Sequence, residues 1–248
     1  MSKVFDGSTQ WLNNNVAPFT AAPFTMACWF NPDTVATEMA LMFVGDKDAT
    51  NNYQNLAFRG DVAGDPIAAG SRNTAYVFAQ SSAGAAGVGG VWYHACGVWA
   101  SATSRVAYFN GANSGSETTS SSPNANDTYA IGRDNDSTPA RFFDGKIAEC
   151  AVWDVALTAA EVAILGLGYS PLFVRPQNLI RYSPLIRVST DLVNVTLTEN
   201  GSPTIDTHPR IIYPSASQMR RFATAGGTPA VQARANAILT TNPFFWGY

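Results

Sequence analysis

The strongest constraint on the fold is a repeated pattern of short runs in which apolar and polar residues alternate. Glycine, asparagine, aspartate and proline separate these runs. In segment 24–30, for example, Phe24, Met26, Cys28 and Phe30 occupy every second position. Alternation places every second side chain on one face of an extended strand, and the turn residues end each strand after a few positions. This pattern favours a sandwich of antiparallel sheets over a parallel sheet covered by helices.

Further strands are expected at the other segments with this pattern. They are 41–44, 55–59, 75–80, 91–99, 105–109, 129–132, 147–153, 179–182 and 192–198. Residues 81–90 and 112–127 are rich in small and polar side chains and predict surface loops. Hydrophobic residues make up 46% of the chain and charged residues 13%, which suits a packed core and argues against disorder. No apolar stretch reaches the ~18 residues of a membrane-spanning helix.

One helix is predicted near 158–167. Thr158 is a suitable N-cap, and Glu161 three positions later completes a capping box. Leu157 and Val162 occupy the two positions of a hydrophobic staple. Because the helix spans about three turns, we expect it to pack on the sandwich as an appendage.

The three cysteines, Cys28, Cys96 and Cys150, each lie inside an apolar run that reads as a strand. An odd number without framework spacing predicts buried, reduced thiols and not a disulfide scaffold. The N-terminal segment has no apolar signal region, so we expect folding in a reducing cytoplasm.

Charge is divided unevenly along the chain. Residues 1–170 carry a net charge of −7 and residues 171–248 a net charge of +4. The overall charge of −3 predicts no general affinity for nucleic acid.

The C-terminal segment combines basic and aromatic residues. After Asp206 every charged side chain is an arginine: Arg210, Arg220, Arg221 and Arg234. The chain closes with four aromatic residues: Phe244, Phe245, Trp246 and Tyr248. Burying each aromatic is worth roughly 1.5–3 kcal/mol, so we expect this tail to dock on a neighbouring subunit. A solvated basic tail is the alternative.

An ordered set of motifs runs through the first two thirds of the chain. They are PheAspGlySer at 5–8, PheThrMetAlaCysTrpPhe at 24–30, TrpTyrHisAlaCysGlyVal at 92–98, ValAlaTyrPheAsnGly at 106–111 and the run from PheAspGly to AlaAlaGluVal at 143–162. The set resembles the laminin-G-like branch of the concanavalin A-like lectin/glucanase superfamily over roughly residues 3–165. The resemblance implies an all-β jelly-roll sandwich of two antiparallel sheets. We assign residues 1–205 to this domain, with closing strands within 179–198, and 206–248 to a C-terminal extension. Segments 169–179 and 208–214 look like extensions of such domains in tailed-bacteriophage structural proteins.

No catalytic residue is expected. Glucanases of this superfamily carry Glu-x-Asp-x-x-Glu on one strand, which aims paired carboxylates into one cleft. This chain lacks that spacing, and Glu149, the nearest strand-borne acid, is expected to be a hydrogen-bonded structural residue. His94 is expected to be a core residue and His208 to lie in a turn. We therefore predict a protein that is not an enzyme.

No cofactor or metal ligand is predicted, with calcium as the alternative. Asp46 with Asp48, and Asp134 with Asp136, offer the hard oxygen ligands that calcium takes. Aspartates in these positions serve equally well as turn formers.

Glycan binding commonly uses an aromatic face together with planar polar groups. The candidate loop residues for such a site are Tyr53, Arg72, Arg133 and Asn135. Four tryptophans lie in predicted strands and are assigned to the core: Trp29, Trp92, Trp99 and Trp153.

Fold does not decide function, so two classes remain open. The leading hypothesis is a bacteriophage virion structural protein that decorates or cements the capsid as a homo-oligomer, with the major capsid protein as partner. It would join the virion after folding in the host bacterial cytoplasm and bind neither nucleic acid nor membrane. The alternative is a carbohydrate-binding or receptor-binding module of a phage tail or fibre, with a glycan as partner.

Overall fold

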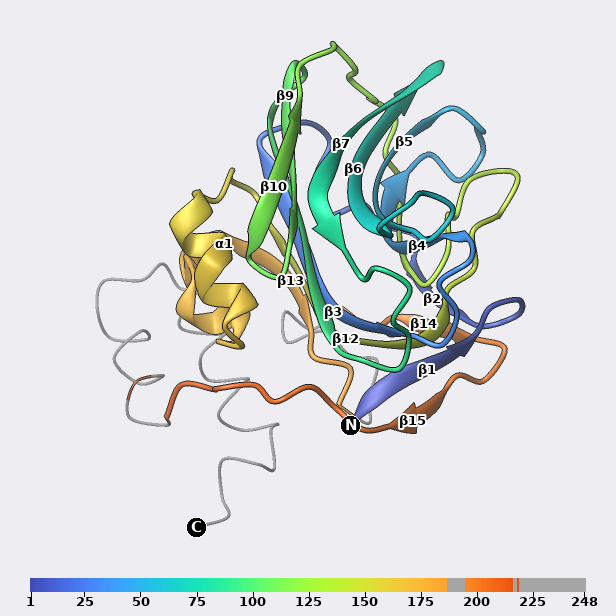
Figure 1. Ribbon diagram of the computed structural model, residues 1–248. Coiled ribbons are helices and arrows are strands. Elements are labelled where there is room, and N and C mark those ends of the chain that lie inside the picture. The colour runs from blue at the N-terminus through green and yellow to red at the C-terminus, as the bar shows by residue number, and fades with distance from the viewer. Residues whose placement is uncertain (187–194, 216–217, 219–248) are drawn as a thin grey trace.

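The computed structural model describes residues 1–186, 195–215 and residue 218, and its core is a sandwich of two antiparallel sheets (Figure 1). The eight-stranded sheet has the order β10 (Ala112–Glu117), β9 (Ser104–Phe109), β8 (Tyr93–Ser101), β3 (Phe24–Pro32), β12 (Asp144–Trp153), β1 (Ser2–Asp6) and β15 (Thr204–Asp206), with β13 (Leu179–Ser183) also paired to β12. The seven-stranded sheet has the order β14 (Thr198–Asn200), β2 (Trp11–Asn14), β11 (Thr128–Ile131), β4 (Glu38–Gly45), β5 (Asn52–Arg59), β6 (Pro66–Asn73) and β7 (Ala75–Gly84). This arrangement confirms the predicted all-β jelly-roll sandwich.

The main hydrophobic core lies between the two sheets. Alternate residues of facing strands fill it, among them Phe30 of β3 and Phe58 of β5. Both are completely buried, as is Phe143, which directly precedes β12. The ring of Phe30 lies 5.4 Å from that of Phe58, which joins the two sheets across the core. The alternation seen in the sequence therefore does select the inward face.

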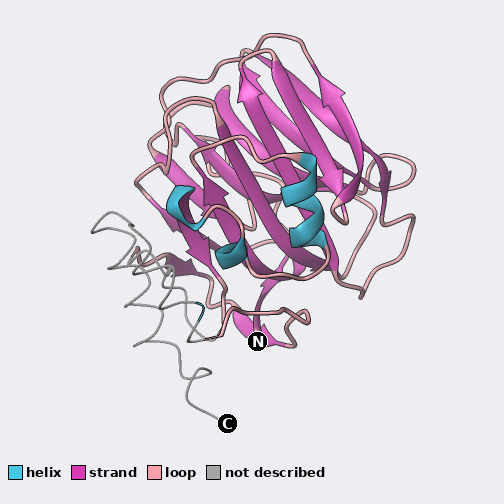
Figure 2. Ribbon diagram, turned by 90° about the vertical axis from the view of Figure 1, so that its left-hand side faces the viewer, coloured by secondary structure: helices cyan, strands magenta, loops and turns pink. Residues whose placement is uncertain are grey.

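A second apolar cluster covers the other side of the eight-stranded sheet. There, α1 (Ala159–Gly166) and the 3-10 helices η1 (Pro171–Phe173) and η2 (Pro176–Asn178) lie across the strands (Figure 2). Trp153 of β12 is fully buried beneath them and donates from Nε1 to the carbonyl of Val174 at 2.8 Å. The other side of the seven-stranded sheet has no such helical cover among the described residues, which leaves it open for a different role.

The predicted helix is confirmed with its capping box. The Thr158 hydroxyl accepts from the Glu161 backbone, and the Glu161 carboxylate accepts from the Thr158 backbone at 2.8 Å. The helix ends at Gly166, which packs against the turn between β9 and β10. A Cβ at Gly166 would lie 2.5 Å from the Cα of Gly111, so this close approach requires glycine.

Two predicted loops are partly wrong. Segment 112–117 forms β10, and the strand predicted at 75–80 continues to Gly84 as β7. β10 is a polar edge strand that pairs with β9 through its backbone after the Asn110–Gly111 turn, so it needs no apolar alternation.

The predicted domain boundary between 205 and 206 coincides with a strand. It falls inside β15, which pairs with β1 in the eight-stranded sheet. Beyond it the chain still packs on the sandwich, since Ile212 forms a parallel bridge with Tyr169. Two backbone hydrogen bonds hold this bridge, from Ile212 to Gly168 at 2.8 Å and from Ser170 to Ile212 at 2.9 Å.

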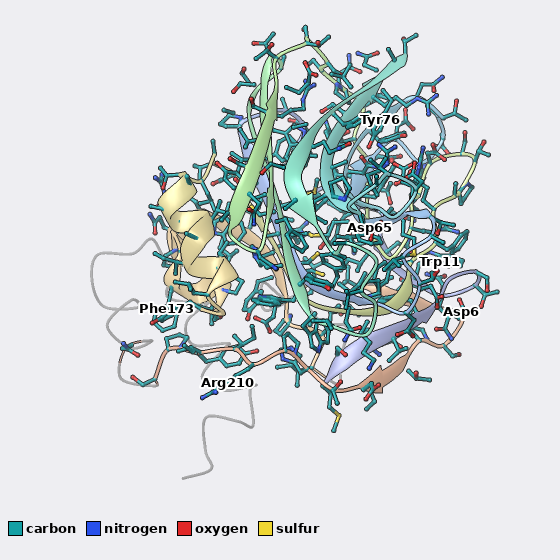
Figure 3. The ribbon with its side chains drawn as sticks, in the orientation of Figure 1. Asp6, Trp11, Asp65, Tyr76, Phe173 and Arg210 are labelled. Carbon is teal, nitrogen blue, oxygen red and sulfur yellow. The ribbon has the colours of Figure 1, made fainter. Side chains whose placement is uncertain are left out.

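Most of the predicted partner-binding tail lies outside the described residues. This applies to Arg220, Arg221, Arg234, Phe244, Phe245, Trp246 and Tyr248, and to the first part of the strand expected at 192–198. Arg210 is described and its side chain is exposed (Figure 3). Within the described part of the chain, no helix is long and apolar enough to cross a membrane.

The three thiols should resist modification in the native protein. Cys28, Cys96 and Cys150 are all buried and are not joined in a disulfide, and burial raises the pKa of the Cys96 thiol. Because the thiolate is the reactive form, native alkylation followed by mass spectrometry should leave all three unmodified. Labelling without denaturant at a rate close to that of the unfolded chain would contradict this.

Candidate functional site

The side of the seven-stranded sheet that points away from the core gathers polar and aromatic side chains, and we call it the outer face. Strand register places Tyr53, Arg72 and Tyr76 side by side on β5, β6 and β7. The segment between β11 and β12, residues 132–143, brings further charged residues to the same face through contacts with Asn55 and Glu38. Figure 3 shows Tyr76 and Trp11 on the side of the molecule opposite α1.

Tyr53 and Arg72, both predicted as loop residues, lie in strands. Tyr53 is in β5, which begins at Asn52, and its side chain is 0% exposed because its ring packs against Phe43 at 5.2 Å and Tyr76 at 6.2 Å. The Tyr53 ring therefore cannot stack on a sugar. Arg72 of β6 is directly opposite Tyr53 and partly exposed. Its Nε is buried without a hydrogen-bond partner among the described residues.

A buried ion-pair network supports the middle of the outer face. Asp134 is 1% exposed and accepts from Arg141 Nη1 at 2.5 Å and from Asn55 Nδ2 at 3.2 Å. Arg141 also donates from Nε to Glu38 at 2.7 Å. Burial raises the pKa of Asp134 to about 6, and the contacts with Arg141 and Asn55 oppose that shift.

Arg133 and Asn135 are brought together, next to a tryptophan. The Arg133 guanidinium lies 3.5 Å from the centre of the Trp11 ring, and its Nη2 donates to Asn135 Oδ1 at 2.5 Å. Asn135 in turn donates to Thr128 Oγ1 at 2.9 Å, which fixes the amide. The Phe142 ring meets the Trp11 ring edge-on at 6.0 Å. The guanidinium is therefore held in one orientation on an aromatic support.

Two guanidinium groups of the outer face, those of Arg72 and Arg133, lie near Asp136 without forming a direct ion pair with it. Arg59 pairs with Asp61, and Arg141 pairs with acidic neighbours. In contrast, neither Arg72 nor Arg133 forms an ion pair with any residue that the structure describes. Arg133 Nε and Nη2 both donate to Asn135 Oδ1, and neither guanidinium is held by a carboxylate in direct contact.

Sequence reasoning missed Trp11 as a site residue. Leu12 of β2 is completely buried in the core, so its neighbours Trp11 and Asn13 point the other way. The alternation at 11–13 is the signal that identifies a partly exposed tryptophan on the outer face. The tryptophans assigned to the core differ among themselves: Trp99 and Trp153 are buried, whereas Trp29 and Trp92 are partly exposed.

Glu149 has the structural contacts expected of it. It lies in an irregular part of β12 and is 2% exposed. Its carboxylate accepts from the Tyr182 and Tyr213 hydroxyls, both at 2.6 Å, and His208 Nε2 lies at 3.3 Å. These contacts tie the segment after β15 to the sandwich.

His94 is a core residue, as predicted. It is 2% exposed, its ring lies 5.5 Å from that of Trp29, and burial lowers its pKa to about 3. A histidine that stays neutral throughout the physiological pH range suits packing better than proton transfer.

The two aspartate pairs considered for calcium are in different surroundings. Asp134 is engaged by Arg141, and Asp136 accepts from the Thr138 backbone at 2.8 Å, as a turn former does. Asp46 and Asp48 gather with Asp127, but the Lys47 ammonium lies among these carboxylates and contacts both Asp48 and Asp127.

Calcium should not stabilise this protein measurably. The Lys47 ammonium, 3.0 Å from Asp127, already supplies a positive charge to the acidic cluster. We expect the Tm to be the same in excess Ca²⁺ and in chelator at constant ionic strength. A saturable rise of Tm with Ca²⁺ would contradict this, because a ligand that binds the native state raises its apparent stability.

The family of the chain follows from its sequence. The model of the concanavalin A-like lectin/glucanases superfamily, in its laminin-G form, matches residues 6–163. The protein belongs to this superfamily. No curated protein matches the chain.

Several solved structures share this fold. A putative carbohydrate-binding protein from Bacteroides ovatus has a TM-score of 0.58 at 19% identity, covering 85% of this chain and 61% of its own. A pentraxin from Limulus polyphemus has a TM-score of 0.54 at 17% identity, covering 66% and 81%. Domain 4 of the arabinanase AbnA from Geobacillus stearothermophilus, solved with arabinotriose, has a TM-score of 0.53 at 20% identity, covering 66% and 76%. At these identities the likeness concerns the fold.

Proposed function

We propose that the protein is a non-catalytic carbohydrate-binding module whose outer face binds an oligosaccharide. One observation carries the proposal: Arg72 and Arg133, held among aromatic side chains, form no direct ion pair with a carboxylate of the described structure.

The physical basis is the amphipathic character of a sugar ring. The C–H face of the sugar ring packs on aromatic rings, and its hydroxyl oxygens at the ring edge accept hydrogen bonds from the planar guanidinium group of an arginine. Trp11, Tyr76 and Phe142 supply partly exposed aromatic surface, and Arg72 and Arg133 supply the donors. The Asp134–Arg141–Glu38 network holds segment 132–143 in place. Less conformational entropy is therefore lost when a ligand binds.

The comparisons favour this proposal over the capsid-decoration hypothesis. One neighbour is described as a carbohydrate-binding protein, and another was solved with arabinotriose. Capsid decoration, attachment to the major capsid protein, homo-oligomerisation and a virion location stay predictions from the sequence alone. They depend largely on residues after 218.

A glycan array followed by titration calorimetry tests the proposal. We expect binding to at least one family of oligosaccharides, with arabino-, xylo- and cello-oligosaccharides as first probes. Arg133→Ala should weaken that binding by about tenfold or more, since a hydrogen bond to a charged group contributes ~1.5–3 kcal/mol. Arg210→Ala, an exposed arginine after β15, is the matched control and should bind like the wild type.

The same samples test the absence of catalysis. Each oligosaccharide that binds is incubated with the protein for a prolonged time and then analysed by chromatography. Its chain length should be unchanged. Binding that Arg133→Ala leaves unchanged would disprove the outer-face proposal, and cleavage would disprove the non-catalytic one.

A further inference from the structure

Four exposed apolar side chains gather around the C-terminal end of α1, and we call them the apolar patch. They are Ile164, Leu167, Tyr169 and Ile212, with exposed fractions of 39%, 74%, 37% and 46%. These four belong to the nine large hydrophobic side chains that are exposed in the described part of the chain. Backbone contacts hold them together, since Tyr169 forms a parallel bridge with Ile212 and its amide donates to the Ile164 carbonyl at 3.4 Å.

No charged side chain interrupts the sequence around the apolar patch. Residues 162–174 carry none, and the two charged residues that flank this stretch, Glu161 and Arg175, form an ion pair with each other at 2.6 Å. The partly exposed ring of Phe173 meets that of Tyr169 edge-on at 5.6 Å, which adds aromatic surface. A contiguous exposed apolar surface of this kind is a typical interaction site.

Segment 207–215 leads the chain directly to the apolar patch. The Tyr213 hydroxyl donates to the Glu149 carboxylate at 2.6 Å, and the Ile212 amide donates to the Gly168 carbonyl at 2.8 Å. Figure 1 shows this segment, in orange, running beneath α1. The residues after 215 therefore start close to the patch.

The later sequence contains a segment that suits the patch. Residues 235–248 have no charged side chain, and four of the five residues at 244–248 are aromatic. An uncharged segment and an uncharged patch can meet without the cost of desolvating a charge, and both gain from the burial of apolar surface. Ser215 and Phe244 are 29 positions apart. Because an extended chain spans about 3.3 Å per position, this connection is long enough for a return to the patch.

The position of Ser215 also favours one host over another. A segment tethered to the chain that carries its binding surface meets that surface at an effective concentration on the order of millimolar, provided that the tether spans the distance. This exceeds the concentration of a second copy in dilute solution. The sequence alone favoured a neighbouring subunit, because it does not show that the chain passes the patch at Ile212.

We propose that residues 244–248 dock on the apolar patch of the same chain. The aromatic rings cover Leu167 and its neighbours and so remove from solvent a surface that otherwise favours self-association. The docking surface lies on the α1 side of the molecule, and the proposal does not depend on glycan binding by the outer face.

Paramagnetic broadening in the full chain tests this docking. A nitroxide is attached to the new thiol of Gly247→Cys, since the native thiols are buried. The observed resonances are the methyl groups of Ile164, Leu167 and Ile212. They should lose most of their intensity, and chemical reduction of the nitroxide should restore it. The methyl groups of Val16, which is 60% exposed in the loop after β2, should keep their intensity.

Two variants distinguish docking from mere proximity of the tether. Leu167→Glu places a charge in the patch, and because Leu167 is largely exposed the fold should persist, which the amide spectrum verifies. The combined Phe245→Ser and Trp246→Ser variant removes two rings from the docking segment. Each change should abolish most of the broadening at the patch. Val16→Glu, a charge at another exposed apolar position, is the matched control and should leave the broadening as it is.

A mixture of two samples distinguishes the same chain from a second copy. Isotope-labelled protein without nitroxide is mixed with unlabelled Gly247→Cys protein that carries it. Docking within one chain leaves the patch methyl groups sharp in this mixture. Broadening in the mixture identifies a second copy as the host and overturns the proposal. The proposal also fails when the nitroxide broadens no patch methyl in its own chain, or when the broadening survives both Leu167→Glu and the combined Phe245 and Trp246 variant.

Discussion

Asp134→Ala is expected to lower the free energy of unfolding by about 2–4 kcal/mol, the cost of removing the shared acceptor of Arg141 and Asn55. The substitution leaves the partly exposed Arg141 with Glu38 as its remaining partner and removes the acceptor of Asn55. Segment 132–143 then loses its anchor on the outer face, so oligosaccharide binding should weaken together with stability. Urea unfolding at neutral pH measures the first effect, and calorimetry measures the second.

Asp134→Asn is the matched variant, because it keeps an acceptor for Arg141 and has no carboxyl to titrate. The pKa of Asp134 is raised to about 6 in the folded protein from an ordinary value of 3.8. Protonation of Asp134 is therefore more favourable in the folded protein than in the unfolded chain. Its contribution to stability is complete below about pH 4 and is lost as the pH rises through about 6. The stability of the wild type relative to Asp134→Asn should increase as the pH falls from 7 to 4. A difference that does not change with pH would contradict the raised pKa.

Glu149→Ala is expected to have an effect of similar size on the opposite side of the molecule. The carboxylate accepts two tyrosine hydroxyls, and hydrogen bonds to a charged group contribute ~1.5–3 kcal/mol each. We expect a loss of about 3–5 kcal/mol, together with release of residues 207–215, since the Tyr213 contact is removed. Hydrogen exchange at the Ile212 amide, which donates to Gly168, reports that release.

Tyr213→Phe separates the two contributions of Glu149. This variant removes the hydroxyl that reaches the carboxylate from the segment after β15, but it leaves the contact with the buried Tyr182 of β13. Its unfolding free energy should change by about half as much as in Glu149→Ala, with faster exchange at Ile212. Unchanged exchange at Ile212 in both variants would show that Glu149 does not hold this segment.

The sequence predicts the sandwich well because alternation and capping are local signals. Strand β3 and helix α1 follow directly from residues 24–30 and 158–161. Strand β10 is missed because edge strands pair through their backbone and need no apolar pattern. The strand at the assigned boundary is also missed, because β15 pairs with β1, some two hundred positions earlier in the chain.

The site is predicted less completely, and the reason is again distance along the chain. Arg133 and Asn135, two of the four candidate residues, are two positions apart and form a hydrogen bond. The contacts of Arg133 with Trp11, and of Asp134 with Asn55, depend on how segment 132–143 crosses the outer face. No local pattern specifies such long-range contacts, and none distinguishes the buried Tyr53 from an exposed loop tyrosine.

Chemical-shift mapping with a bound oligosaccharide is the most direct test of the outer-face site. A titration of the isotope-labelled protein should shift the Trp11 indole resonance and amides of β5, β6, β7 and segment 132–143. Resonances of α1, on the opposite side of the sandwich, should stay in place. Shifts confined to α1 and β13, or the absence of shifts with every oligosaccharide that the array selects, would contradict a glycan site on the outer face.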